Sequence, residues 1–130
     1  MGQDDMSSYG DKQILLVDDF ATMRKIVRNE LHKLGFKGIL EAEDGKQALE
    51  VLAMAAVDLI ITDWNMPTMD GLELLKAIRA DSRIKHIPVL MLTAEAKREN
   101  VIEALKAGVT NYIVKPFTAE ALKAKIEKVL

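Results

Sequence analysis

The sequence contains no cysteine, which excludes disulfide bonds and thiolate chemistry and is typical of a reducing compartment. It also has no apolar stretch long enough to span a bilayer, and its first residues lack the basic-then-apolar layout of a signal peptide. The formal net charge is only −2 and the pI is about 5.7, so the charge gives no indication of nucleic-acid binding. We therefore expect a cytoplasmic protein that neither inserts into a membrane nor binds nucleic acid.

The chain has 130 residues, of which 49% are hydrophobic, and this suits one compact domain with an ordinary core. Residues 1–12 are polar and acidic and carry glycine and serine, so we expect a flexible leader outside the fold. Residues 13–130 are expected to form the domain. At that length we expect no separate DNA-binding output module.

Short apolar runs alternate with amphipathic stretches along the domain. The runs, several of them rich in β-branched residues, are 14–17, 38–42, 59–62, 89–92 and 112–114. Such runs are typical of strands that are buried on both faces of a parallel sheet. Between them, apolar residues at helical spacing and capping signals such as Asp70 with Glu73 predict helices. The alternation predicts an α/β fold with a mostly parallel sheet and helices on both faces.

Polar residues directly follow four of these apolar runs. Asp18 and Asp19 follow the first run, Asp63 the third, Thr93 the fourth and Lys115 the fifth. Because ligands of open α/β sheets bind beyond the carboxyl ends of the strands, we expect these side chains to converge on one edge. Each signal is weak by itself, since an aspartate there can be a helix cap or a turn residue. Their repetition at successive strand ends indicates a site.

Three carboxylates in one crevice require either a retained proton or a bound cation. Oxygen ligands without cysteine or nearby histidine favour a hard cation such as Mg²⁺, which usually binds phosphate oxygens as well. An aspartate can itself accept a phosphoryl group. Thr93 could then hydrogen-bond one phosphoryl oxygen and Lys115 could neutralise another. The residues therefore predict phosphoryl chemistry.

Several motifs surround these residues. They are Val17-Asp18-Asp19, Thr62-Asp63-Trp64-Asn65-Met66-Pro67, Met69-Asp70-Gly71, Thr93-Ala94 and Lys115-Pro116-Phe117. As a set they are highly specific, and from about Gln13 to Leu130 the chain resembles the receiver domain of response regulators, particularly chemotaxis regulators of the CheY type. The resemblance implies a flavodoxin-like (βα)5 three-layer sandwich, with a parallel five-stranded sheet of order 2-1-3-4-5.

The resemblance also implies a role for each acidic residue. Asp63 would take a phosphoryl group from the phosphohistidine of a CheA-type histidine kinase. Asp19, Asp63 and the backbone carbonyl of Asn65 would hold Mg²⁺, and Asp18 would act largely through water. Asn65 and Glu95 would tune how water attacks the acyl phosphate, so that the domain assists its own phosphorylation and dephosphorylation without being an enzyme in the usual sense.

The resemblance places Thr93 and Lys115 on the phosphoryl oxygens and implies a cis peptide before Pro116. Movement of Thr93 would then let Tyr112 turn inward and switch a partner face. That face would comprise Ala96, Lys97, Val101, Tyr112, Leu122 and Lys125, whose apolar and basic character suits an amphipathic acidic helix. The implied partner is the flagellar motor switch protein, and a phosphatase is a possible further partner. The regulator would be a monomer. An ordinary charged surface is the alternative for this face.

Other functions fit parts of the pattern. A regulator of this kind could serve as a phosphate sink or a phosphorelay intermediate that never contacts the motor. A haloacid-dehalogenase-type phosphohydrolase would need a second acid in a D-x-D pattern, whereas the first run is followed by Asp18-Asp19-Phe20. A flavodoxin-like electron carrier would need a phosphate-cradling loop there, and two aspartates would repel the flavin phosphate.

Overall fold

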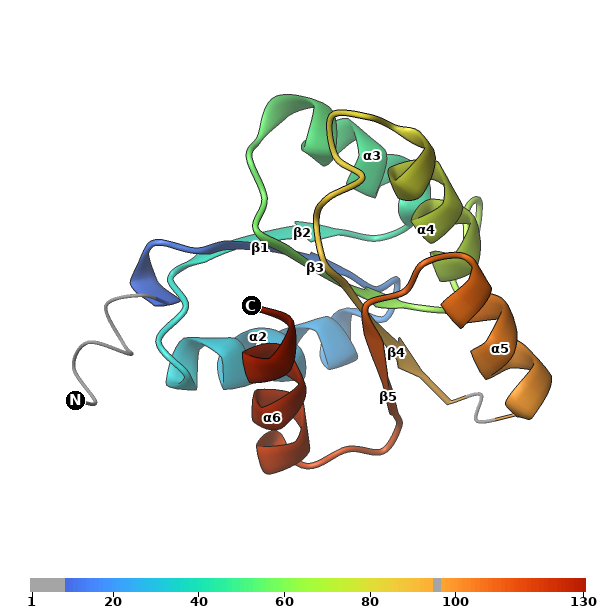
Figure 1. Cartoon of the computed structure of the whole chain (residues 1–130). Coiled ribbons are helices and arrows are strands. Elements are labelled where there is room, and N and C mark those ends of the chain that lie inside the picture. Colours follow the sequence, from blue (N-terminus) through green and yellow to red (C-terminus); the bar gives the residue numbers. More distant parts are fainter. Residues whose placement is uncertain (1–8, 95–96) are drawn as a thin grey trace.

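The computed structural model describes residues 9–94 and 97–130, and it shows one parallel sheet between two layers of helices (Figure 1). The strands are β1 (Gln13–Val17), β2 (Gly38–Ala42), β3 (Leu59–Asp63), β4 (Val89–Thr93) and β5 (Asn111–Val114). Their order is β2-β1-β3-β4-β5, and each neighbouring pair is parallel. The strand order implied by the family resemblance is confirmed.

Helices follow the strands in alternation and cover both faces of the sheet. They are α2 (Ala21–Lys33), α3 (Gly45–Met54), α4 (Gly71–Ala80), α5 (Arg98–Lys106) and α6 (Ala119–Val129). In Figure 1, α2 and α6 lie on one side of the sheet, and α3, α4 and α5 lie on the other. The predicted three-layer arrangement is therefore present.

The sheet divides the core into two clusters, because successive side chains of a strand point to opposite faces. Leu15 and Val17 of β1 pack toward α3, α4 and α5, whereas Ile14 and Leu16 pack toward α2 and α6. All four side chains are almost completely buried. This double burial explains why the central strands are continuous apolar runs in the sequence.

Local signals fix where the helices begin and end. The Asp70 carboxylate accepts the backbone N–H of Glu73, and the Glu73 carboxylate accepts the N–H of Asp70, which completes the predicted capping box of α4. Gly35 and Gly108, which follow α2 and α5, have φ angles of 103° and 95°. Glycine adopts this left-handed backbone without steric cost, so both helices stop where the sequence predicts.

Tyr9, which falls within the predicted leader, contacts the domain. The Tyr9 ring stacks on Phe36, with 4.6 Å between ring centroids and an interplanar angle of 17°. Residues 1–8 lie outside the described residues, so a flexible leader remains a prediction for them. Within the described ranges, no helix is long and apolar enough to cross a membrane.

Candidate metal and phosphoacceptor site

The polar residues singled out in the sequence meet at the carboxyl edge of the sheet. Asp63 and Thr93 are the last residues of β3 and β4, and Asp18 and Lys115 directly follow β1 and β5. The parallel register aligns these strand ends, since Asp63 pairs with Leu92, next to Thr93. The predicted convergence is confirmed for these side chains.

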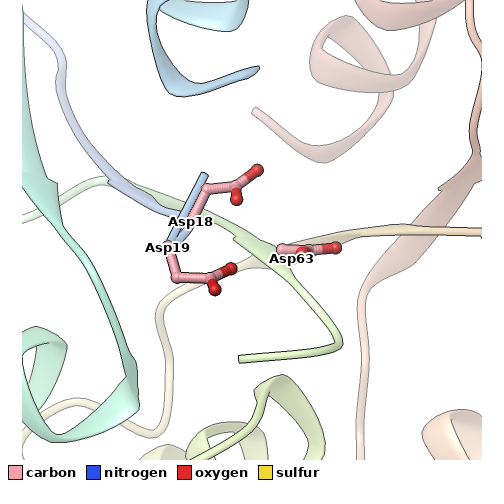
Figure 2. A group of neighbouring side chains, drawn as sticks. All are labelled: Asp18, Asp19 and Asp63. Atoms are coloured by element: carbon pink, nitrogen blue, oxygen red, sulfur yellow. The ribbon is translucent and has the colours of Figure 1, made fainter. Parts of the chain in front are cut away.

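The acidic cluster consists of Asp18, Asp19 and Asp63, whose side chains face a common space (Figure 2). One carboxylate oxygen from each of these residues lies within 4.8 Å of the others. Lys115 Nζ donates to Asp63 Oδ1 at 3.0 Å and lies 3.9 Å from Asp18 Oδ2. The site thus gathers three carboxylates, of which those of Asp63 and Asp18 lie within 3.9 Å of one ammonium group.

Asp18 is only 2% exposed and is held firmly by its backbone neighbours. Its N–H donates to the carbonyl of Ala42, and its Oδ1 accepts the N–H of Phe20 at 2.9 Å. Asp18 Oδ2 is buried and has no hydrogen-bond partner among the described residues. One buried carboxylate oxygen is therefore left to face the cluster without a donor, which is costly unless a ligand completes it.

Burial raises the pKa of the Asp18 carboxyl above its ordinary value. The hydrogen bond from the Phe20 amide and the Lys115 charge lower the pKa, while the charges of Asp63 and Asp19 raise it further. The net result is a carboxyl group whose ionised form is less favourable in the protein than in water. A bound cation would remove this cost, because it favours the ionised form.

The cluster fits Mg²⁺ in three respects. Its donors are carboxylate oxygens, the class that hard cations prefer. The 4.8 Å span accommodates one ion that keeps some of its water molecules, as Mg²⁺ usually does. The unpartnered Asp18 Oδ2 supplies an acceptor that a metal-bound water can satisfy. The three carboxylates would hold the ion, and the exposed Asn65 lies two residues beyond Asp63.

Backbone contacts hold Asp63 in a fixed position. Asp63 is 9% exposed, and the next residue, Trp64, donates its N–H to Leu92 of β4. Gly71, the first residue of α4, donates to the Trp64 carbonyl at 2.7 Å. A Cβ added at Gly71 would overlap the Asp63 carbonyl oxygen. The Met69-Asp70-Gly71 motif therefore lets α4 begin directly against the end of β3.

Thr93 and Lys115 are joined through their backbones, because the Lys115 N–H donates to the Thr93 carbonyl at 2.8 Å. Thr93 is almost completely buried beside the cluster. The peptide between Lys115 and Pro116 is cis, as the resemblance implied. Both side chains are thus at the edge where their predicted contacts with a phosphoryl group would form.

The predicted switch residue Tyr112 is half-buried in β5 and packs against the core cluster. Lys125 Nζ lies 5.6 Å from the centroid of its ring and donates to Asn111 Oδ1 at 3.1 Å. Lys97 is exposed and Val101 is half-buried at the start of α5. The partner-face residue Ala96 and the tuning residue Glu95 lie outside the described residues.

The prediction that Leu122 lies on the partner face is wrong. Leu122 is 0% exposed and belongs to the core cluster beneath α6, together with Ile126. The helical spacing of these two residues marks the buried stripe of α6 rather than its surface. Exposed apolar side chains occur on α5 instead, at Ile102 and at Leu105, which is 55% exposed.

An ion-pair cluster beside the site is a feature that the sequence reasoning missed. Arg24 and Arg28 of α2 both bind Glu41 of β2, at 2.8 Å and 2.7 Å. Arg24 and Arg28 are four residues apart, which puts them on one helix face, and this spacing can be seen in the sequence. Their acidic partner lies on another element, so no local pattern identifies it.

The chain is similar to known chemotaxis proteins over most of its length. The family model of the response regulator receiver domain matches residues 14–127. Chemotaxis protein CheY of Pseudomonas aeruginosa is 59% identical over 117 residues, which are 90% of this chain and 94% of that protein. Chemotaxis protein CheY-3 of Vibrio cholerae is 60% identical over 117 residues, 90% of each chain.

Solved structures show the same fold. Chemotaxis protein CheY4 of Vibrio cholerae superposes with a TM-score of 0.85 at 39% identity, covering 92% of this chain and 98% of that one. The receiver domain of a Pseudomonas aeruginosa sensor histidine kinase gives a TM-score of 0.83 at 29% identity, covering 91% and 96%. That receiver was solved with a magnesium ion coordinated in its active-site cleft.

Proposed function

Because this chain belongs to the response regulator receiver family, we propose that it is a chemotaxis regulator that a histidine kinase phosphorylates on Asp63, with Mg²⁺ as cofactor. Receivers are signalling proteins and not classical enzymes. The single observation that carries the proposal is the environment of Asp63. It ends β3, is paired with Lys115, and has one carboxylate oxygen within 4.8 Å of an oxygen of Asp18 and of Asp19.

The phosphoryl transfer follows from this arrangement. A carboxylate oxygen of Asp63 attacks the phosphorus, and the bond from phosphorus to the kinase histidine breaks, so that the imidazole leaves with that electron pair. Lys115 already lies 3.0 Å from the Asp63 carboxylate and can neutralise a phosphoryl oxygen. The Thr93 hydroxyl can donate to another oxygen. A bound Mg²⁺ would offset the charge that the phosphate adds to the acidic cluster.

The signal ends when water hydrolyses the acyl phosphate. Asn65 is exposed and lies two residues beyond the acceptor Asp63 in the sequence, which supports a role for its side chain in the approach of water. We assign this tuning role to Asn65 together with Glu95, as in related regulators. The domain would therefore assist both its own phosphorylation and its own dephosphorylation.

The output we propose is binding of the flagellar motor switch protein by a cytoplasmic monomer. The chemotaxis proteins that resemble this chain support this output. Tyr112, Lys125, Lys97, Val101 and Ala96 would contribute to the partner face. Phosphorylation would bias the position of Tyr112 through Thr93, which is a local packing change with a distant effect.

The proposal is tested by transfer from a phosphorylated CheA-type kinase with labelled phosphate. We expect label on the wild type and none on Asp63→Asn, while Asp44→Asn, which keeps its helix-capping acceptor, should accept label normally. Label on Asp63→Asn would refute Asp63 as the acceptor. A phosphorylated chain that does not bind a motor switch peptide would instead favour a phosphate sink or relay.

A further inference from the structure

The side chain of Arg24 connects the acidic cluster to the neighbouring strand. Its Nη1 donates to the backbone carbonyl of Asp18 at 2.5 Å, and its Nε donates to Glu41 Oε1 at 2.8 Å. Only 17% of the Arg24 side chain is exposed. The planar guanidinium therefore bridges the end of β1 and the end of β2 with two charge-assisted hydrogen bonds.

The carbonyl that Arg24 holds belongs to the peptide linking Asp18 to Asp19. Because a peptide unit is planar, fixing this oxygen also restricts where Asp19 begins. The same short loop is held by the Asp18 N–H on Ala42 and by the Arg24 N–H on Phe20. Arg24 thus contributes to the placement of two of the three carboxylates without contacting either carboxylate group itself.

Glu41 holds the guanidinium in place. Burial alone would raise the pKa of Glu41, but the hydrogen bonds and charges of Arg28 and Arg24 outweigh it and lower that pKa. Glu41 is therefore ionised at neutral pH and accepts from both arginines. Arg28 binds the second oxygen, Glu41 Oε2, at 2.7 Å. Arg28 shares the ion pair, but no contact joins it to Asp18 in the described structure.

We propose that Arg24, oriented by Glu41, is a positioning residue for the metal site, which holds the Asp18–Asp19 peptide in the geometry that binds Mg²⁺. This inference rests on the proposed Mg²⁺-dependent function. A lysine could not replace Arg24, because a single ammonium cannot reproduce the fork that reaches both acceptors. Groups that orient metal ligands in this way commonly set the affinity of the site.

The sign of the effect separates positioning from simple electrostatics. Arg24 is a positive charge close to a cation site, so its removal should strengthen Mg²⁺ binding if charge alone mattered. Loss of positioning should weaken binding instead. Arg28 provides a matched control, since it has the same charge, the same helix and the same partner, Glu41, but lacks the bond to Asp18.

The experiment is a Mg²⁺ titration of the purified full chain followed by Trp64 fluorescence, with wild type, Arg24→Met and Arg28→Met. We expect the Kd of Arg24→Met to rise about tenfold, as for other residues that orient metal ligands, and that of Arg28→Met to change less than about twofold. Urea unfolding in EDTA measures the stability of each variant separately. An Arg24→Met Kd equal to or below that of the wild type would overturn the proposal, and so would equal weakening by both substitutions.

Arg24→Lys provides a second test in case Arg24→Met does not fold. It keeps the charge and most of the stem but loses the two-pronged contact, so its Kd should also rise severalfold. An unchanged Kd in a folded Arg24→Lys would contradict the positioning role. If the wild type itself binds no Mg²⁺, the proposed function fails. If the wild type and Arg24→Met bind Mg²⁺ equally well, only the positioning role of Arg24 fails.

Discussion

Asp18 and Glu41 are acidic residues at the ends of neighbouring strands, yet the protein treats them in opposite ways. Glu41 receives hydrogen bonds from two arginines, and its pKa is lowered. Asp18 is more deeply buried, one of its oxygens has no donor among the described residues, and its pKa is raised. The same side of the sheet thus contains Glu41, whose two oxygens both accept hydrogen bonds, and Asp18, one of whose oxygens accepts none from the described residues.

The difference supports the proposal that Asp18, and not Glu41, serves a ligand. Buried polar atoms in folded proteins are nearly always paired, so an unpaired carboxylate oxygen calls for an explanation. A cation supplies one, since it would occupy the space that Asp18, Asp19 and Asp63 face. Arg24 joins the two regions, because it binds both the Glu41 carboxylate and the Asp18 backbone.

The largest effect on stability should come from disturbing the frame of the acidic cluster. Gly71→Ala would place a Cβ against the Asp63 carbonyl oxygen and 2.9 Å from Trp64 Cα, and backbone atoms cannot move aside cheaply. We expect destabilisation by about 2 kcal/mol, although alanine is the better helix former. Urea unfolding measures it. Gly10→Ala is the control, because a Cβ there meets nothing within 4 Å, and equal effects of the two substitutions would contradict this account.

The second prediction concerns Asp18, the carboxylate with an unpaired oxygen. Because the pKa of Asp18 is raised in the folded state, the folded chain binds more protons than the unfolded chain between the ordinary pKa of 3.8 and the raised value. Stability is therefore lost as the pH rises through this interval, and the cost persists at neutral pH. Asp18→Asn should stabilise the protein in EDTA at pH 7 by on the order of 1 kcal/mol.

Mg²⁺ should make the wild type more stable than Asp18→Asn, the reverse of the order expected in EDTA. The wild type gains stability when it binds the ion, and Asp18→Asn gains less because it has lost a carboxylate. Chemical unfolding with EDTA and with excess Mg²⁺ tests both halves of the prediction. An Asp18→Asn variant that is less stable than the wild type in EDTA would show that Asp18 is a satisfied structural group.

The smallest effect on stability is expected at Glu41, the carboxylate that both arginines bind. Glu41→Gln removes the charge that both arginines bind and should cost about 0.5 kcal/mol at pH 7, because the pair is partly exposed. Because the folded pKa of Glu41 lies below its ordinary value of 4.5, this contribution is complete above pH 4.5 and is lost as the pH falls through the lowered pKa. Unfolding curves from neutral to acidic pH should therefore show the two proteins converging, whereas a pH-independent gap would exclude the ion pair as its source.

Much of the site was predictable because strand ends can be recognised in the sequence. Asp18, Asp63, Thr93 and Lys115 each follow an apolar run, and parallel strands bring their carboxyl ends to one edge. The strand order itself came from the family resemblance, since apolar runs do not specify their neighbours. Local signals for the helix ends, such as the capping box at Asp70, were equally reliable.

The features that were missed depend on packing between distant elements. The bond from Arg24 to Asp18 and the close approach of Gly71 to Asp63 are set by how helices dock on the sheet. Leu122 was placed on the surface, although the apolar periodicity of α6 marks its buried stripe. In α5 the opposite happens, because Leu105 belongs to the apolar pattern but is exposed. Periodicity alone does not say which apolar residues a helix buries.

The most direct test of the central claim is to add acetyl phosphate to the wild type and to Asp63→Asn, with and without Mg²⁺, and to follow Trp64 fluorescence together with intact mass. Trp64 adjoins the acceptor and is half-buried, so its environment should respond to the phosphoryl group. We predict a Mg²⁺-dependent change in fluorescence and the mass of one added phosphoryl group in the wild type, with neither in Asp63→Asn. A wild type that shows no phosphorylated mass, or a mutant that shows the same mass, would contradict Asp63 as the phosphoacceptor of this acidic site.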